Sequence, residues 1–194
     1  KESVVTVPLN NLGSVCETQV PNNLPGTSDA NTDTYDLEKA KAYLEESGVD
    51  VSGMSFPIIC SDDTKKRAGE VIQANLKEIG IEANIESMDL ATYLSTVAEG
   101  NFVAAIGGYG MGDTISYLNG VYHSKSINGS NKSRLNNPEI DAMIDQAGAT
   151  IDQAQREALT EQICAKLNEI CTQAPLYQPL TLRAFNADLQ GVKV

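Results

Sequence analysis

The sequence lacks any apolar run long enough to cross a membrane. A transmembrane helix needs about 20 consecutive apolar residues, and no stretch of the 194 residues approaches that length. A signal peptide and a lipid-attachment motif are also missing from the sequence as given. The first residues, Lys1-Glu2-Ser3-Val4-Val5, resemble a cut inside a longer chain, so we expect the sequence to be a fragment.

Basic residues are scarce. There are 14 Lys and Arg against 26 Asp and Glu, which gives a net charge of −12. Nucleic-acid binding is disfavoured, because neutralising phosphates requires clustered Lys and Arg. Anionic membrane surfaces are disfavoured for the same reason.

Metal-ligand patterns are missing as well. None of the four cysteines forms Cys-x-x-Cys, and His123 is the only histidine, so we expect no zinc site. Cys164 and Cys171 would lie about 10 Å apart along one helix, too far for a disulfide bond. We favour free, partly buried thiols over any disulfide for Cys16, Cys60, Cys164 and Cys171.

Catalytic motifs are absent too. The sequence has no P-loop, no Gly-x-Ser-x-Gly, no His-Glu-x-x-His and no EF-hand loop. A catalytic triad would need His123, which we expect to be a solvated side chain in a polar loop. Several carboxylates are explained as helix caps: Asp36, Asp63, Asp89 and Asp152. We therefore expect no catalytic residue, no cofactor and no enzymatic activity.

What the sequence does contain is the pattern of an α/β domain. The hydrophobic fraction of 41% is enough for a buried core. Residues 1–35 are rich in turn formers and predict an extended lead-in. Helices are predicted after the capping residues Asp36, Asp62 or Asp63, Asp89 and Asp152, over Ser116–Tyr122, and from Pro138 as a first helical residue. Strands are predicted at Met54–Cys60, Ile81–Met88, Phe102–Ile106 and Leu176–Phe185.

These elements predict a layered mixed β-sheet flanked by helices. Pro57 indicates an edge strand or a bulge for the first of the strands. The last helix, which we expect to be the longest, should end at Pro175.

A glycine-rich turn follows the third strand and reads Gly107-Gly108-Tyr109-Gly110-Met111-Gly112-Asp113. One interpretation is a tight turn with a purely structural role. Another is a site where backbone approaches a ligand, since ligands in open α/β sheets bind at strand ends. An enzyme that binds a phosphorylated cofactor at Gly107–Gly112 is an alternative of another class, although the glycines do not match Gly-x-Gly-x-x-Gly in register.

Five segments in order resemble the C-terminal lobe of the peptide-type solute-binding proteins of ABC importers, the oligopeptide- and dipeptide-binding family 5. The segments are residues 35–48, residues 72–81 with Tyr93-Leu94, the strand to Ile106 with its Gly-aromatic turn, residues 137–156, and residues 174–192. The resemblance covers roughly residues 8–194.

This resemblance implies that residues 1–194 form a single ligand-binding lobe of a two-lobe periplasmic-binding-protein-like fold. The function implied is capture of a small polar solute, an oligopeptide or dipeptide above all, by closure of two lobes. Oligosaccharides and metal chelates are alternative ligands in the same family. The implied partners are the missing N-terminal lobe and the importer's membrane subunits. The implied location is extracellular or periplasmic, on a protein anchored as a lipoprotein.

The resemblance also points to ligand residues. Gly108-Tyr109 matches the family's Gly-Trp, but the aspartate three residues later that can hold a peptide amine has no counterpart here. Our candidate ligand-binding residues are Gly108, Tyr109, Gly110, Asp113, Asn131 and Arg134. Two structural alternatives stay open: Tyr109 could pack on the next helix, and Asp113 could cap it. We expect residues 107–113 and 124–137 to be exposed.

Overall fold

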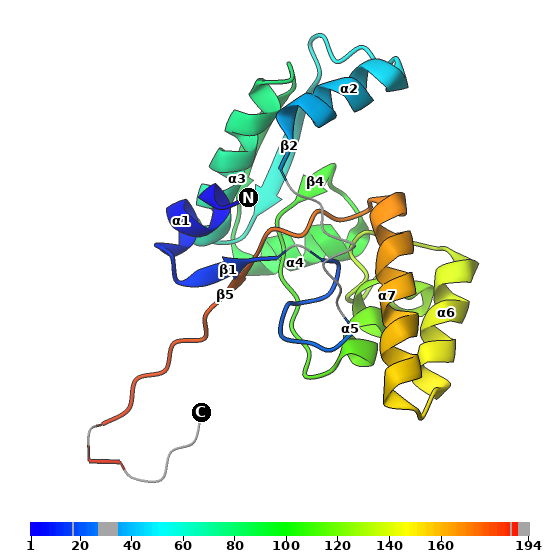
Figure 1. Ribbon diagram of the computed structural model, residues 1–194. Coiled ribbons are helices and arrows are strands. Elements are labelled where there is room, and N and C mark those ends of the chain that lie inside the picture. The colour runs from blue at the N-terminus through cyan, green and yellow to red at the C-terminus, as the bar shows by residue number, and fades with distance from the viewer. Residues whose placement is uncertain (17, 27–34, 187, 190–194) are drawn as a thin grey trace.

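The computed structural model describes residues 1–16, 18–26, 35–186 and 188–189 and has the predicted α/β fold (Figure 1). The helices are α1 (Ser3–Leu9), α2 (Leu37–Ser47), α3 (Asp63–Lys77), α4 (Leu90–Glu99), α5 (Thr114–Val121), α6 (Pro138–Ala149), α7 (Gln153–Ile170) and the 3-10 helix Ser124–Ser126. The strands are β1 (Gly13–Val15), β2 (Ser55–Cys60), β3 (Glu82–Ser87), β4 (Ala104–Ala105) and β5 (Tyr177–Pro179).

Polar residues begin most of the helices, as predicted. The carboxylates of Asp36, Asp89 and Asp152 accept hydrogen bonds from backbone N–H groups in the first turns of α2, α4 and α7. The cap of α3 is Asp62, whose carboxylate accepts from the backbone N–H of Lys65. Of the two aspartates expected at this helix start, Asp62 is thus the cap, and Asp63, which we had also explained as a cap, is the first residue of the helix.

A parallel three-stranded sheet in the order β3-β2-β4 is the centre of the α/β part. On one face Ile58 packs in a buried cluster with Ala68 of α3. On the other face Ile59 packs with Val97 of α4. Burial on both faces explains why β2 is apolar throughout its second half, because adjacent side chains of a strand point to opposite faces.

Pro57 lies in the central strand of this sheet, so the prediction of an edge strand or a bulge is wrong. The carbonyl group of Met54 accepts a hydrogen bond from the first residue of β3, and that of Cys60 accepts one from the residue after β3. The carbonyl group of Ile59 points the other way and accepts a hydrogen bond from Ile106, the residue after β4. Odd-numbered residues of β2 therefore face β4, which pairs only with Ile58 and Ile59. The missing N–H of Pro57 points past the start of β4, where no hydrogen bond is lost.

A second core joins α5, α6 and α7, which lie together on one side of the molecule (Figure 1). Its fully buried members include Leu118, Ile144, Ile163 and Leu167. Leu159 and Ile170 of α7 pack against the same core. The helix ends at Cys171, which adopts a left-handed conformation with φ 53°, and so stops before the predicted end at Pro175.

The N-terminal residues are more structured than the extended lead-in that we expected over 1–35. Residues Ser3–Leu9 form α1, which buries Val4 and Val5 and contacts α3. Strand β1 pairs antiparallel with β5 at the other end of the sequence, so parallel and antiparallel pairing occur in two separate sheets. Residues 27–34 of the expected lead-in lie outside the described residues.

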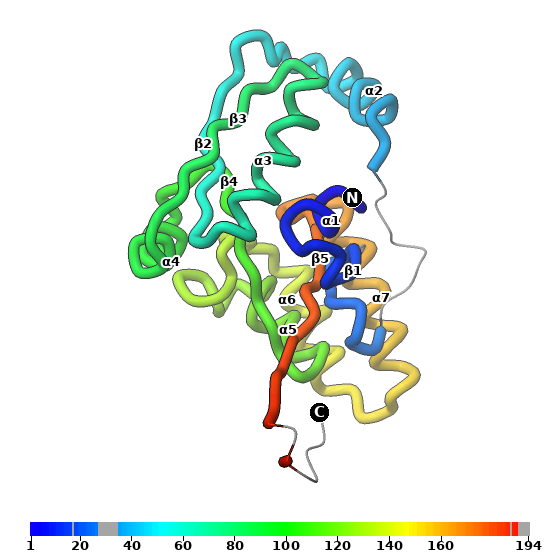
Figure 2. Tube along the Cα trace, turned by 90° about the vertical axis from the view of Figure 1, so that its left-hand side faces the viewer, coloured from blue at the N-terminus to red at the C-terminus, as the bar shows by residue number. Residues whose placement is uncertain are grey.

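The chain leaves the body of the protein after β5 (Figures 1 and 2). The strand predicted over Leu176–Phe185 is confined to Tyr177–Pro179, because β1 offers only three residues for pairing. One further backbone hydrogen bond joins Leu180 to Leu12. Beyond it, Leu182 is 69% exposed and Phe185 is 48% exposed.

Candidate functional site

The glycine-rich turn lies at the carboxyl end of β4. The strands of this sheet are parallel, so the ends of β2 and β3 are at the same edge. All residues from Gly107 to Asp113 are exposed, which confirms the prediction for this segment. The turn therefore occupies the position at which open α/β sheets bind ligands.

The backbone of this turn makes no hydrogen bond to any residue that the structure describes. Within the part of the chain that the structure describes, no N–H or C=O group of residues 107–112 has a hydrogen-bond partner. The residue just before the turn, Ile106, is hydrogen-bonded: its carbonyl oxygen accepts a 3.1 Å hydrogen bond from the hydroxyl of Tyr93. Backbone polar groups must find partners in protein, water or ligand, so this turn has unused capacity for a partner outside the lobe.

The glycines of the turn fall into two kinds. A Cβ on Gly107 would lie 2.9 Å from the hydroxyl oxygen of Tyr93, so packing requires glycine there. At Gly108, Gly110 and Gly112 a Cβ would meet no atom within 4 Å, and none of these glycines has a positive φ. Neither strain nor crowding within the described chain explains these three glycines, whereas close approach of another molecule would.

Tyr109 packs on the following helix and remains partly exposed. Its ring centroid lies 5.9 Å from that of Tyr117, with the planes tilted by 54°. The ring also lies over Gly120 of α5. The side chain is 39% exposed, so the contact with α5 leaves part of the ring accessible to another molecule.

Asp113 caps α5. Its Oδ1 accepts a 2.8 Å hydrogen bond from the backbone N–H of Ser116. Hydrogen bonds from the Ser116 backbone and side chain lower the pKa of this carboxyl group below its ordinary value. Capping is thus an observed role of Asp113, and contact with a ligand would be an additional one.

Asn131 is a structural residue of its loop. Its side chain was expected in an exposed polar loop, but the residue is 1% exposed. The amide nitrogen donates to the carbonyl oxygens of Leu135, His123 and Tyr122 at 2.9, 3.2 and 3.4 Å. The amide oxygen accepts from the backbone N–H of Leu135 and the hydroxyl of Ser133. Both polar atoms of the Asn131 side chain are therefore engaged within the loop, which is a structural role, and a binding role for this residue stays a prediction.

Arg134 contacts a different part of the sheet from the glycine-rich turn. Its Nη1 donates a 3.1 Å hydrogen bond to the carbonyl oxygen of Ala98 near the end of α4. A Cβ on Gly100 would lie 2.9 Å from Cδ of Arg134, so the side chain passes over that glycine. These contacts lie before β4, whereas the turn follows β4. The structure does not bring Arg134 and Tyr109 together.

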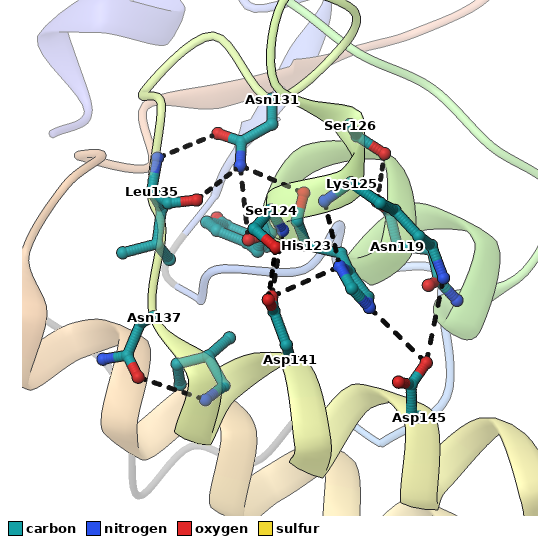
Figure 3. Close-up of polar contacts among 12 residues, drawn as sticks. Asn119, His123, Ser124, Lys125, Ser126, Asn131, Leu135, Asn137, Asp141 and Asp145 are labelled. Atoms are coloured by element: carbon teal, nitrogen blue, oxygen red, sulfur yellow. Dashed lines mark hydrogen bonds and ion pairs between the residues drawn. The ribbon is translucent and has the colours of Figure 1, made fainter.

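His123 is buried, contrary to the solvated side chain that we expected. It is 7% exposed and lies between two carboxylates of α6, with Nδ1 3.2 Å from Asp141 and Nε2 3.5 Å from Asp145 (Figure 3). The backbone N–H of Ser124 donates to Asp141 at 2.9 Å, which fastens the 3-10 helix to α6. The sequence signal that could have revealed this contact is the spacing of Asp141 and Asp145, which puts both on one helix face.

A hollow of about 300 Å³ lies between α5 and α7 and includes Asp113, Arg156 and Thr160 in its lining. Two of its polar side chains are engaged within the protein. The guanidinium of Arg156 donates to the carbonyl oxygen of Thr150 at 3.0 Å, and the hydroxyl of Thr160 donates to the carbonyl oxygen of Arg156 at 3.0 Å. Among the described residues, no cluster could hold a metal ion, and no helix could span a membrane.

Comparison with known protein families identifies the lobe. Residues 1–129 match the model of the bacterial extracellular solute-binding proteins, family 5 Middle. The chain belongs to this family of solute-binding proteins. The segment matched includes the parallel sheet and the glycine-rich turn, so the candidate site lies in a part of the chain that family 5 defines.

Individual relatives are similar over most of this chain but are much longer. Heme-binding protein A of Haemophilus influenzae is 29% identical over 84% of the chain, and the dipeptide-binding protein of Escherichia coli is 27% identical over 84%. The chain spans about a third of each, 31% and 32%. A Pseudoalteromonas dipeptide-binding protein in complex with Met-Leu has the same fold, with a TM-score of 0.87, 19% identity, and coverage of 100% of this chain and 40% of that one.

Proposed function

We propose that this chain is one lobe of the substrate-binding component of an ABC importer, and that it captures a small polar solute, a peptide above all. The observation that carries the proposal is the turn Gly107–Gly112, which is exposed and whose backbone groups have no hydrogen-bond partner among the described residues. An extended peptide offers the complementary row of N–H and C=O groups, as in strand addition to a sheet edge.

The side chains of the turn suit the same role. Gly108, Gly110 and Gly112 leave space at alternate positions, so a ligand backbone can come within hydrogen-bond distance. The intervening Tyr109 and Met111 are both partly exposed and supply apolar surface. Recognition through main-chain groups accepts peptides of varied sequence, and the apolar side chains add contact area to it.

The proposed site needs a second wall. A turn on the surface of one lobe cannot enclose a solute, and high affinity depends on burying most of the ligand surface. We therefore propose that a second lobe of the same parent protein closes over the turn by a hinge motion. Leu180, Leu182 and Phe185 in the segment after β5 are exposed and would pack against that lobe.

The further partners are the importer's membrane subunits, and the location is extracellular or periplasmic, with a lipid anchor on the parent protein.

An enzyme that binds a phosphorylated cofactor at this turn fits the structure less well. A phosphate would bind where backbone N–H groups open the following helix. The Asp113 carboxylate already occupies that end of α5 and would repel a phosphate. The relatives reported above are named as binding proteins, in agreement with a non-enzymatic role.

Calorimetry on the complete parent protein tests the proposal. The panel should contain several dipeptides, of which Met-Leu is the first to be tested, together with tripeptides, an oligosaccharide, a nickel chelate, haem and ATP. We expect a peptide to bind. Gly110→Val should weaken that binding about tenfold or more, since a branched side chain would occupy the open face of the turn. Asn136→Val puts the same side chain at an exposed loop position outside the turn and should bind normally. Silence for every solute together with turnover of a substrate would refute the transport role.

A further inference from the structure

Gly120 lies inside α5, where glycine is an unfavourable residue. In a helix interior it lowers stability by about 0.5–1 kcal/mol relative to alanine. A Cβ at this position would lie 2.6 Å from the hydroxyl oxygen of Tyr109 and 2.9 Å from its Cε1 and Cζ. The absent side chain of Gly120 therefore leaves the space that the outer end of the Tyr109 ring occupies.

A second contact of this ring comes from the same helix. Tyr117 lies one turn before Gly120, and its ring is 5.9 Å from that of Tyr109. The helix is fixed in turn, because Leu118 is fully buried in the core and Tyr122 is 2% exposed. Tyr122 also donates its hydroxyl to the carbonyl oxygen of Gln19 at 3.0 Å. Tyr109 is thus docked on a rigid surface.

The docking contact matters because no hydrogen bond within the described part of the chain fixes the turn. Residues 107–112 have no hydrogen bond to another described residue, so backbone interactions do not fix their conformation. Packing of Tyr109 on Gly120 and Tyr117 fixes the middle of the turn between Ile106 and Asp113. The position of the ring then determines which way the neighbouring glycines face.

We propose that Gly120 is a positioning residue of the binding turn: it seats Tyr109 against α5 and thereby holds Gly108 and Gly110 in the conformation that meets the ligand. This inference rests on the proposed function of the turn. Gly120 contributes no atom to the ligand and acts through Tyr109, so it also sets how far the tyrosine hydroxyl reaches over α5.

The decisive variant is Gly120→Ala in the complete parent protein. The ring must leave its seat, because the hydroxyl end that lies over Gly120 would meet the new methyl group, and the partial exposure of Tyr109 leaves room on the solvent side. We expect the melting temperature to stay the same or rise, since alanine favours the helix. We expect Tyr109 ring resonances, assigned by comparison with Tyr109→Phe, to move toward solvent-exposed values. Affinity for the panel dipeptide that binds the wild type should fall about tenfold.

Two controls separate positioning from a general effect of the substitution. Gly148→Ala is the matched helical variant, because a Cβ there would lie 3.4 Å from Ile115, an ordinary contact distance, and it should change neither the spectrum nor the affinity. The double variant Gly120→Ala with Tyr109→Ala should bind as weakly as Tyr109→Ala alone. The losses of binding free energy from two substitutions do not add when one residue acts through the other.

The inference is overturned if Gly120→Ala binds as well as the wild type, if Tyr109 resonances do not move, or if the losses from the two substitutions add. Failure of the proposed function has a different signature. In that case the wild type binds nothing in the panel, while Gly120→Ala still displaces the ring; the seat is then supported and its role in ligand binding is refuted.

Discussion

Replacing Asn131 tests whether its side chain holds the polar loop 124–137 in place through hydrogen bonds to the backbone. In the structure the Asn131 side chain is 1% exposed and satisfies three carbonyl groups and one backbone N–H. In Asn131→Ala these four backbone groups lose this partner at once, although the carbonyl oxygen of His123 still accepts from the backbone N–H of Ser126 at 3.0 Å. The loop would keep the hydrogen bond from Ser124 to Asp141 but lose the contacts that Asn131 makes between the end of α5 and the start of α6.

The expected loss follows from the number of groups left without partners. Each buried polar group without a hydrogen bond costs about 1–3 kcal/mol, and water entering the space can satisfy some of them. We therefore expect the free energy of unfolding to fall by about 3 kcal/mol. For a chain of this size that corresponds to a melting temperature lower by roughly 6–12 °C.

Urea unfolding followed by circular dichroism measures this difference. Asn136→Ala is the control, because Asn136 is an exposed asparagine of the same loop and should change stability by less than about 0.5 kcal/mol. An Asn131→Ala protein as stable as the wild type would refute the structural role. If that stable variant also lost peptide affinity in the parent protein, Asn131 would be a ligand residue after all.

Three further predictions concern other parts of the lobe. Asp113→Ala should lower the free energy of unfolding by about 1 kcal/mol near neutral pH. The pKa of this carboxyl group is lowered in the folded state, so its contribution to stability is present above the ordinary carboxyl pKa and is lost as the pH falls through the lowered value. Urea unfolding of the variant and of the wild type should therefore give the same free energy in acid. Cys171 is exposed and should react with a thiol reagent at neutral pH. Cys60 and Cys164 are buried, and burial raises the pKa of both thiols, that of Cys164 to about 12. Mass spectrometry should find Cys60 and Cys164 modified only after the protein is unfolded. Leu182→Asp should leave the stability of the 194-residue chain unchanged but lower that of the parent protein, and equal melting temperatures in the parent would contradict the proposed packing of this segment.

The sequence predicted those elements whose signals are local. Asp36, Asp89 and Asp152 cap helices because each side chain meets N–H groups two or three residues ahead, and such a pattern can be read without knowing the fold. The pairing of β1 with β5 could not be read, because the two strands lie near opposite ends of the sequence and neither is long enough to show alternation. Pro57 misled for the same reason, since only the register of β4 shows that its missing N–H is harmless.

The candidate site shows a second limit, which concerns polarity. Composition suggested that the Ser- and Asn-rich loop 124–137 would be solvated, whereas for the glycine-rich turn it left a purely structural turn and a ligand-binding turn both open. The structure reverses the expectation for part of the polar loop. In the polar loop, Asn131 and the neighbouring His123 turn inward to hydrogen bond with backbone or to lie beside carboxylates, and this loop is held in place by its own polar groups.

The turn Gly107–Gly112, by contrast, has few polar side chains, and its backbone groups have no hydrogen-bond partner among the described residues. A polar side chain in a loop can be satisfied by its own neighbours, whereas a bare backbone held away from other strands cannot satisfy itself. The better guide to a binding surface in this lobe is therefore the set of hydrogen bonds that the chain leaves unmade. By that measure the glycines beside Tyr109, and the seat that holds the tyrosine, are stronger candidates for ligand recognition than the polar loop.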